Sequence, residues 1–342
     1  MKGEAMADHS EKIAPKGRVG VNLSGLAPLT RIFGDAQSLG LLVFLVVLSI
    51  CFSFMSPVFF SVQNLLNVLL SVSIIGVMAA VSTLVVVGRG LDLSVGSVAA
   101  LSGVVAGMAV ETAGYPWWIG VIAGITAGTA AGVFNGIVVT VLNINPIITT
   151  IGTLSLFRGV AFIITDGHTI AVNDEVLLFI GSGRVLGIPV AIFLLVLVFL
   201  LCHIVAEKTK IGRSLYAIGA SPRASLLSGL NLRQIRFWAF AASGASAGVA
   251  GLLLVGQSGT AVPSAATAYE LLVVTAVLLG GTSLAGGEGR TVGTLLGVLI
   301  IGTLNNGMTL LAVPSFYQIA ANGLLLLVAV WLDQLRRGPQ IE

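Results

Sequence analysis

The sequence predicts an all-α polytopic membrane protein with about ten transmembrane helices. Of its 342 residues, 56% are apolar, against roughly 45–50% in globular domains, and the mean hydropathy is +1.04. Charged residues make up 9% of the chain, whereas soluble domains contain roughly 25%. The apolar runs are unbroken, while the strands of a membrane β-barrel would alternate polar and apolar residues. The 43 glycines also fit helices that pack closely in lipid.

Ten stretches of the chain are candidates for the spans, since a helix crosses the bilayer with about 20 apolar residues. Turn residues such as Ser56-Pro57 and Gly114-Tyr115-Pro116 separate these stretches. The predicted spans are 39–56, 64–87, 93–110, 117–142, 147–164, 188–206, 236–257, 270–286, 291–312 and 316–333.

The basic residues predict which side of the membrane each loop faces. With ten spans and a cytoplasmic N-terminus, 15 of the 17 Lys and Arg residues lie on the cytoplasmic side, and only Arg158 and Arg184 do not. This arrangement satisfies the positive-inside rule. We therefore expect a cytoplasmic tail over residues 1–38, a transmembrane domain over 39–333 and a second cytoplasmic tail over 334–342.

The loop over residues 207–236, here called the basic loop, carries six basic residues against a single acid, Glu207. The six are Lys208, Lys210, Arg213, Arg223, Arg233 and Arg236. A short helix over 222–228 is predicted inside this loop. Ser221 suits its N-cap, Pro222 its first position and Gly229 its end.

A helix of two turns outside the membrane is not stable alone. Leu226 and Leu227 of the predicted helix must therefore pack against another surface. The sequence leaves two surfaces open: the ends of this protein's own helices, or a groove in a partner subunit.

A second candidate region is the run from Gly88 to Ser97, between the second and third spans. Its glycines permit a sharp turn that other residues adopt only with strain. Asp92 stands before a helix that opens with Leu93-Ser94, so its carboxylate can accept amide hydrogens at the positive end of that helix. Ionisable groups inside a membrane are also functional candidates by default. The sequence thus leaves a helix cap and a gate or substrate contact open for Asp92, and the two roles are compatible.

A weak internal repeat connects the two halves of the chain. Asn135-Gly136 followed by Pro146 recurs as Asn306-Gly307 followed by Pro314, and the two Asn-Gly pairs are 171 residues apart. The pairs fall on the fourth and ninth spans, which run in opposite directions in the predicted topology. This pattern indicates an inverted repeat of five helices, a known basis of alternating access. Chance is the alternative reading, because Gly and Asn are common in such helices.

Several function classes find no support in the sequence. It lacks the Gly-Lys-Ser/Thr ending of a nucleotide-binding loop, and no Ser/His/Asp arrangement or cluster of metal ligands stands out. Cys51 and Cys202 lie inside apolar runs and read as small hydrophobic residues. We expect no catalytic residue, no metal site, no cofactor bound by this chain and no binding of nucleic acid.

Taken together, the motifs resemble the permease subunits of bacterial ribose-type ABC sugar importers, which are binding-protein-dependent permeases. The resemblance covers about residues 40–333. It rests on the run Gly90 to Ser97, on Asn145-Pro146 with Thr153-Leu154 and Arg158-Gly159, on Gly212-Arg213 through Gly219, on Leu227-Ser228-Gly229, on Tyr269-Glu270-Leu271, on the run Gly280 to Gly293, and on Asn305-Asn306-Gly307.

The resemblance implies partners and a location. A second permease copy would complete the pathway, cytoplasmic ABC ATPase subunits would use the ATP, and a periplasmic sugar-binding protein would deliver a pentose or hexose. The chain would lie in the lipid of the bacterial inner (plasma) membrane with both termini in the cytoplasm.

The resemblance also implies roles for particular residues. The basic loop would be the coupling loop that docks on the ATPase, through Gly212, Arg213, Gly219, Ser221, Pro222, Arg223, Leu226, Leu227 and Gly229. The candidates for the translocation pathway or its gate are Asp92, Ser94, Asn135 and Asn306.

Two positions depart from the pattern of the resembled family. Arg89 stands where a second glycine is usual before the Asp motif, and Leu272 stands where an acid usually follows Glu-Leu.

A competing function is an ion- or proton-coupled secondary transporter of a small polar solute, with Asp92 as the carrier.

Overall fold

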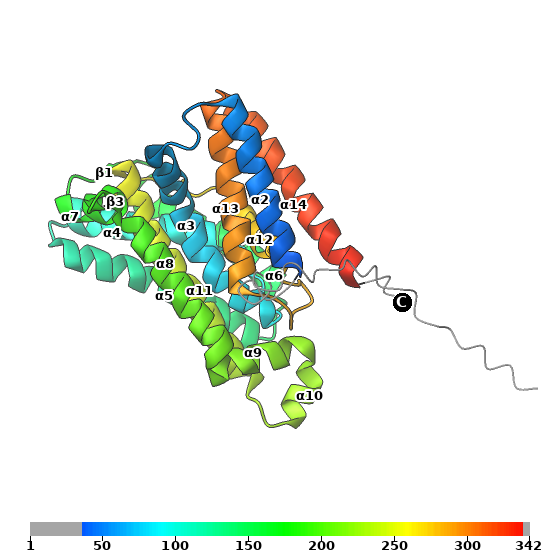
Figure 1. The fold of residues 1–342 in the computed structure, drawn as a ribbon. Helices are drawn as coiled ribbons and strands as arrows, with labels where there is room; N and C mark the ends of the chain where they lie inside the picture. The colour runs from blue at the N-terminus through cyan, green and yellow to red at the C-terminus, as the bar shows by residue number, and fades with distance from the viewer. Residues whose placement is uncertain (1–35, 338–342) are drawn as a thin grey trace, which may run out of the picture.

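The computed structural model describes residues 36–337, which form a helical bundle (Figure 1). The predicted tails, 1–38 and 334–342, lie largely outside this range, although the last helix continues to Arg337. The helices are α2 (Ala36–Met55), α3 (Val62–Val87), α4 (Val95–Gly107), the π-helical η2 (Met108–Thr112), α5 (Trp117–Thr140), α6 (Pro146–Ile164), α7 (Glu175–Ser182), α8 (Val190–Lys208), α9 (Lys210–Ala220), α10 (Pro222–Leu227), α11 (Leu232–Ser258), α12 (Tyr269–Leu279), α13 (Thr291–Leu310) and α14 (Ser315–Arg337). Two antiparallel pairs of two-residue strands join β1 (Ile170–Ala171) to β4 (Thr260–Ala261) and β2 (Arg184–Val185) to β3 (Ile188–Pro189).

Nine helical segments within residues 36–337 are long and apolar enough to cross a membrane. They are α2, α3, α4 continued by η2, α5, α6, α8, α11, α13 and α14. These segments coincide with nine of the ten predicted spans. The predicted class, an all-α polytopic membrane protein, is therefore confirmed.

The predicted span over 270–286 is too long. α12 has 11 residues, which gives a length of about 16 Å at 1.5 Å per residue, or about half the thickness of the bilayer core. The helix ends because Gly280 and Gly281 close it with a turn in which Gly281 has a φ of +90°. Gly286 and Gly287 also have positive φ angles, of +80° and +79°, so the end of the predicted span is an irregular turn.

The packing of the helices follows an inverted repeat. α3 packs against α12 and α13, and α11 makes the equivalent contacts with α4 and α5. Likewise, α4 packs against α6, and α12 packs against α14. α5 ends beside α10, where Val139 and Leu226 line one pocket. α13 begins at this same end, after a turn in which the Gly289 carbonyl binds Tyr216 of α9. α5 and α13 therefore run in opposite directions, as the repeat predicts.

The most extensive contact between two helices is the crossing of α5 and α11, where glycines allow the two backbones to touch. A Cβ atom added to Gly244 of α11 would collide with the backbones of Gly128 and Gly132 of α5. Small residues at such crossings are typical of helices that associate in lipid, where van der Waals contact replaces the hydrophobic effect.

The basic loop projects from one end of α8 and α11, here called the basic end, while β1, β3 and α7 lie at the other end (Figure 1). The predicted helix over 222–228 is confirmed as α10, with the Ser221 hydroxyl accepting from the Ala224 amide at 3.3 Å. Gly229 follows with a φ of +82°. α9 was not predicted, although Ile211, Leu215 and Ile218 repeat at helical spacing.

Candidate functional site

The first candidate site is a buried polar cluster around Asp92, in the loop that joins α3 to α4. One carboxylate oxygen, Oδ1, accepts from the Ser94 amide at 3.0 Å and from the Ser94 hydroxyl at 2.6 Å. The other, Oδ2, accepts from the Ser243 hydroxyl of α11 at 2.7 Å. Asp92 is 4% exposed. Its carboxylate therefore ties the 88–94 loop to α11 and accepts from the amide of Ser94, the N-cap residue of α4, and not from an amide inside the helix.

Asn135 extends this cluster to α5. Its side-chain amide donates to the Ser94 hydroxyl at 2.8 Å, and the residue is fully buried. Its carbonyl oxygen, Oδ1, has no hydrogen-bond partner, an uncommon state for a buried polar atom. Three of the four predicted pathway residues, Asp92, Ser94 and Asn135, thus meet in one place. Ser243, the fourth member of the cluster, was not predicted.

Asn306, the fourth predicted pathway residue, lies elsewhere. It forms a reciprocal pair with Asn64 near the start of α3, with amide-to-oxygen distances of 2.9 and 3.0 Å. This pair lies at the end of the bundle opposite the basic end, because α3 begins there and runs to Gly88. Asn306 therefore lies apart from Asn135, as expected for equivalent positions of an inverted repeat, and its role in the pathway stays a prediction.

Arg158 of α6 holds the loop between α11 and α12. Its Nη1 atom donates to the Pro263 carbonyl at 2.8 Å and to the Ala265 carbonyl at 2.6 Å. The same loop contains Ala266 and Ala268 with φ angles of +52° and +68°, a conformation that residues other than glycine adopt at a cost. The guanidinium therefore stabilises a strained connection.

We expect Arg158→Ala to lower the free energy of unfolding by about 2–3 kcal/mol, since hydrogen bonds from charged groups are worth roughly 1.5–3 kcal/mol each. Thermal unfolding of the purified protein in detergent measures this loss. Arg158→Lys, which keeps the charge, should restore part of it. An unchanged unfolding midpoint in Arg158→Ala would contradict this role.

The second candidate site is the surface of α9 and α10 at the basic end. Gly212 and Gly219, both predicted to act in coupling, are buried and touch backbone of this chain: Gly212 lies against Val205 and Ala206, and Gly219 against Val87. These two glycines fix α9 in place. The remaining predicted coupling residues differ, because Arg213, Ser221, Arg223 and Gly229 are exposed and Pro222 is partly exposed.

Leu226 and Leu227 of α10 are 64% and 83% exposed. Of the two surfaces that the sequence left open for them, the protein's own helix ends do not cover these side chains. Ser225, between α10 and the rest of the protein, is buried instead. α10 thus rests on the protein through one face and presents two leucines on another.

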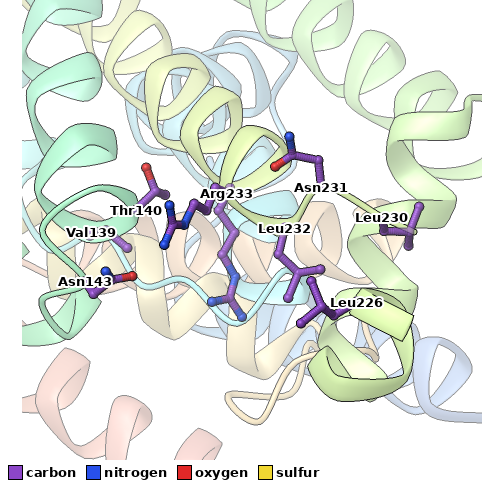
Figure 2. Close-up of a pocket in the computed structure, with 9 residues that line it drawn as sticks. Val139, Thr140, Asn143, Leu226, Leu230, Asn231, Leu232 and Arg233 are labelled. Atoms are coloured by element: carbon purple, nitrogen blue, oxygen red, sulfur yellow. The ribbon is translucent and has the colours of Figure 1, made fainter. Parts of the chain in front are cut away.

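A pocket of about 510 Å³ adjoins α10 (Figure 2). It lies between the end of α5, α10 and the start of α11, and is lined by Val139, Thr140, Asn143, Leu226, Leu230, Asn231, Leu232, Arg233 and Arg236. No ion pair joins either arginine to an acid in the described part of the chain. The pocket combines an apolar wall with two positive charges, so it suits a partner that offers apolar and acidic side chains.

Neither site contains a set of side chains that could bind a metal ion, among the described residues. Within residues 36–337, no three His, Cys, Asp or Glu side chains lie together as ligands of an ion would.

Comparison with known proteins places these features in a family. Residues 64–330 match the family described as the permease component of the branched-chain amino acid transport system. The chain is 40% identical over 293 residues to the ribose import permease protein RbsC of Haemophilus influenzae, covering 84% of this chain and 90% of that protein.

Two further relatives cover similar shares. The ribose import permease protein RbsC of Bacillus subtilis is 42% identical over 305 residues, 88% of this chain and 94% of the relative. The L-arabinose transport system permease protein AraH of Escherichia coli is 35% identical over 298 residues, 87% and 90% of the two chains. No solved structure matches. The chain therefore belongs to the family whose description is the permease component of the branched-chain amino acid transport system.

Proposed function

We propose that this chain is the transmembrane permease subunit of an ATP-driven importer for a pentose or a related sugar. The observation that carries the proposal is the open face of α10, where Leu226 and Leu227 are exposed next to a pocket lined by two arginines that form no ion pair with an acid among the described residues. The sequence shows no Gly-Lys-Ser/Thr nucleotide-binding loop, so in an ATP-driven importer a separate ATPase would supply the energy. Relatives named as ribose and L-arabinose permeases support a sugar as the substrate.

The proposed assembly contains a second permease copy, cytoplasmic ABC ATPase subunits and a periplasmic sugar-binding protein, in the bacterial inner membrane. The basic loop would face the cytoplasm, because positive loops stay on that side. The ATPase would dock on α10, and its ATP-dependent movement would favour one arrangement of the two halves of the bundle. Asp92, Ser94 and Asn135 would belong to the part of the translocation pathway that changes its arrangement when the ATPase moves.

A second candidate function is a secondary transporter in which Asp92 carries a proton or an ion. One observation weighs against it: both oxygens of the Asp92 carboxylate already accept hydrogen bonds from serines inside the packed bundle. In a secondary transporter, the ion must bind to the carrier carboxylate and leave it again in each transport cycle. Asp92 is better suited to hold the 88–94 loop in place.

Reconstitution separates the two functions. The permease is placed in liposomes with its ATPase, the binding protein and radiolabelled ribose or L-arabinose. Uptake is expected only when ATP is inside the compartment that the ATPase faces, and the ATPase should co-purify with the permease. Uptake driven by a proton gradient without ATP would establish the secondary transporter instead.

A further inference from the structure

Arg89 occupies an unusual backbone position directly after α3. Its φ is +61°, in the left-handed region that residues other than glycine seldom adopt. The turn is closed by hydrogen bonds from the Arg89 amide to the Val86 carbonyl at 2.9 Å and from the Gly90 amide to the Val85 carbonyl at 2.8 Å. Glycine would meet the demands of this turn without strain. The backbone alone therefore does not explain an arginine at this position, and the explanation must lie in the contacts of its side chain.

The guanidinium of Arg89 reaches the end of α9. Its Nε atom donates to the Gly219 carbonyl at 2.7 Å, and its Nη2 atom lies 3.4 Å from the Ala220 carbonyl. The last carbonyls of a helix have no partner within the helix and carry partial negative charge. A cation that donates to them forms a charge-assisted bond, which is stronger than one between neutral groups. Arg89 thus fastens the end of α9 to the end of α3.

Other contacts hold α9 against the same region. Gly219 has no room for a side chain because the Val87 carbonyl and the Gly287 amide lie against it. The Gly287 amide in turn donates to the Val87 carbonyl at 2.8 Å. The Tyr216 hydroxyl donates to the Gly289 carbonyl at 2.8 Å. Burial raises the pKa of Tyr216 above its ordinary value.

From Arg89 the chain runs directly into the buried polar cluster. The Thr150 hydroxyl of α6 lies 3.1 Å from the Leu91 carbonyl and 2.9 Å from the Pro146 carbonyl of its own helix. Asp92 follows, held by Ser94 and Ser243. Only two residues separate Arg89 from Asp92. The loop is held at Arg89 by its bonds to α9 and at Asp92 by its bonds to the serines. Because the segment between them is so short, a displacement of Arg89 also displaces the start of α4.

We propose that Arg89 is a positioning residue that transmits movement of α9 and α10 to the 88–94 loop and its Asp92 cluster. The proposal rests on the proposed function, in which an ATPase moves α10. It assigns to Arg89 a role that the backbone alone would not require, and it explains why a strained arginine occupies a turn suited to glycine.

The test replaces Arg89 in the full permease, assembled with its ATPase and binding protein in liposomes. Arg89→Gly removes the bonds to α9 and also relieves the left-handed strain. We expect its thermal midpoint to stay close to that of the native protein, because the relief of strain offsets the lost hydrogen bonds, and its ATPase still to co-purify. Sugar transported per ATP hydrolysed should fall by about tenfold, the loss expected for one hydrogen bond from a charged group. Arg89→Lys, which keeps the positive charge, should recover part of the ratio.

Ala312→Gly is the matched control, because Ala312 also has a positive φ, of +54°, and lies exposed in the turn between α13 and α14. Ala312→Gly should relieve backbone strain as Arg89→Gly does, while the sugar transported per ATP hydrolysed stays at the native value. A native ratio in Arg89→Gly would overturn the proposal, as would loss of folding in both Arg89→Gly and Arg89→Lys, which would make the residue purely structural. Failure of the native permease to co-purify with an ATPase would instead refute the proposed function, whatever the variants do.

Discussion

Replacement of Leu227 by Asp is expected to abolish ATP-driven sugar uptake while leaving the membrane domain folded. The Leu227 side chain is 83% exposed, so the folded permease loses almost no packing when it changes. In the proposed complex the same position is covered by the ATPase, where a carboxylate would be buried without a partner. Anchor residues at interfaces cost about 2 kcal/mol or more when removed, which is roughly a thirtyfold loss of affinity.

The measurement is retention of the ATPase during affinity purification, together with uptake in liposomes. Leu186→Asp provides the control, because Leu186 is 96% exposed in the turn between β2 and β3, at the end away from the basic loop. This variant should retain the ATPase. Native uptake in Leu227→Asp would show that α10 is not the docking element.

Replacement of Gly244 by Leu should prevent the bundle from folding. A Cβ atom at this position already collides with the backbones of Gly128 and Gly132, so a leucine must push α5 away from α11. Overpacking of a core usually costs about 1–3 kcal/mol because side chains can move aside. Backbone cannot move aside, and α11 also packs against α3, α4 and α7, so the cost should exceed that range.

The yield of monodisperse protein after extraction in detergent reports this effect. Gly152→Leu is the matched substitution, since Gly152 lies on α6 with open space around its Cβ position. We expect it to express at the native level. Equal yields of the two variants would contradict the close α5–α11 contact.

The positions of the spans follow from apolar length, because lipid imposes that length on any crossing helix. α12 was the exception. Its residues are as apolar as those of a full span, but Gly281, Gly286 and Gly287 adopt positive φ angles that break the helix early, and apolar composition does not register backbone conformation. α9 was missed because it is amphipathic and lies in a charged loop, where hydropathy gives no signal.

The candidate site was predicted only in part. Asp92 and Ser94 are close in sequence and their capping geometry is local, so their association could be expected. Ser243 is one of several small polar residues on α11, and only the crossing of helices selects it as the partner of Asp92. Asn135 and Asn306 are equivalent positions of the predicted inverted repeat, and the structure gives them separate partners, Ser94 for Asn135 and Asn64 for Asn306. Local patterns therefore identified candidate residues, and tertiary packing decided their partners.

The most direct test of the account is photo-crosslinking from position 227 in inner-membrane vesicles. In the proposed assembly, this chain takes its driving force from an ATPase bound to α10 on the cytoplasmic side. A photoreactive residue in place of Leu227 should therefore crosslink to the ATPase subunit, and a membrane-impermeant thiol reagent should reach a cysteine there only from the cytoplasmic face. Labelling from the outer face, with no crosslink to an ATPase, would contradict it.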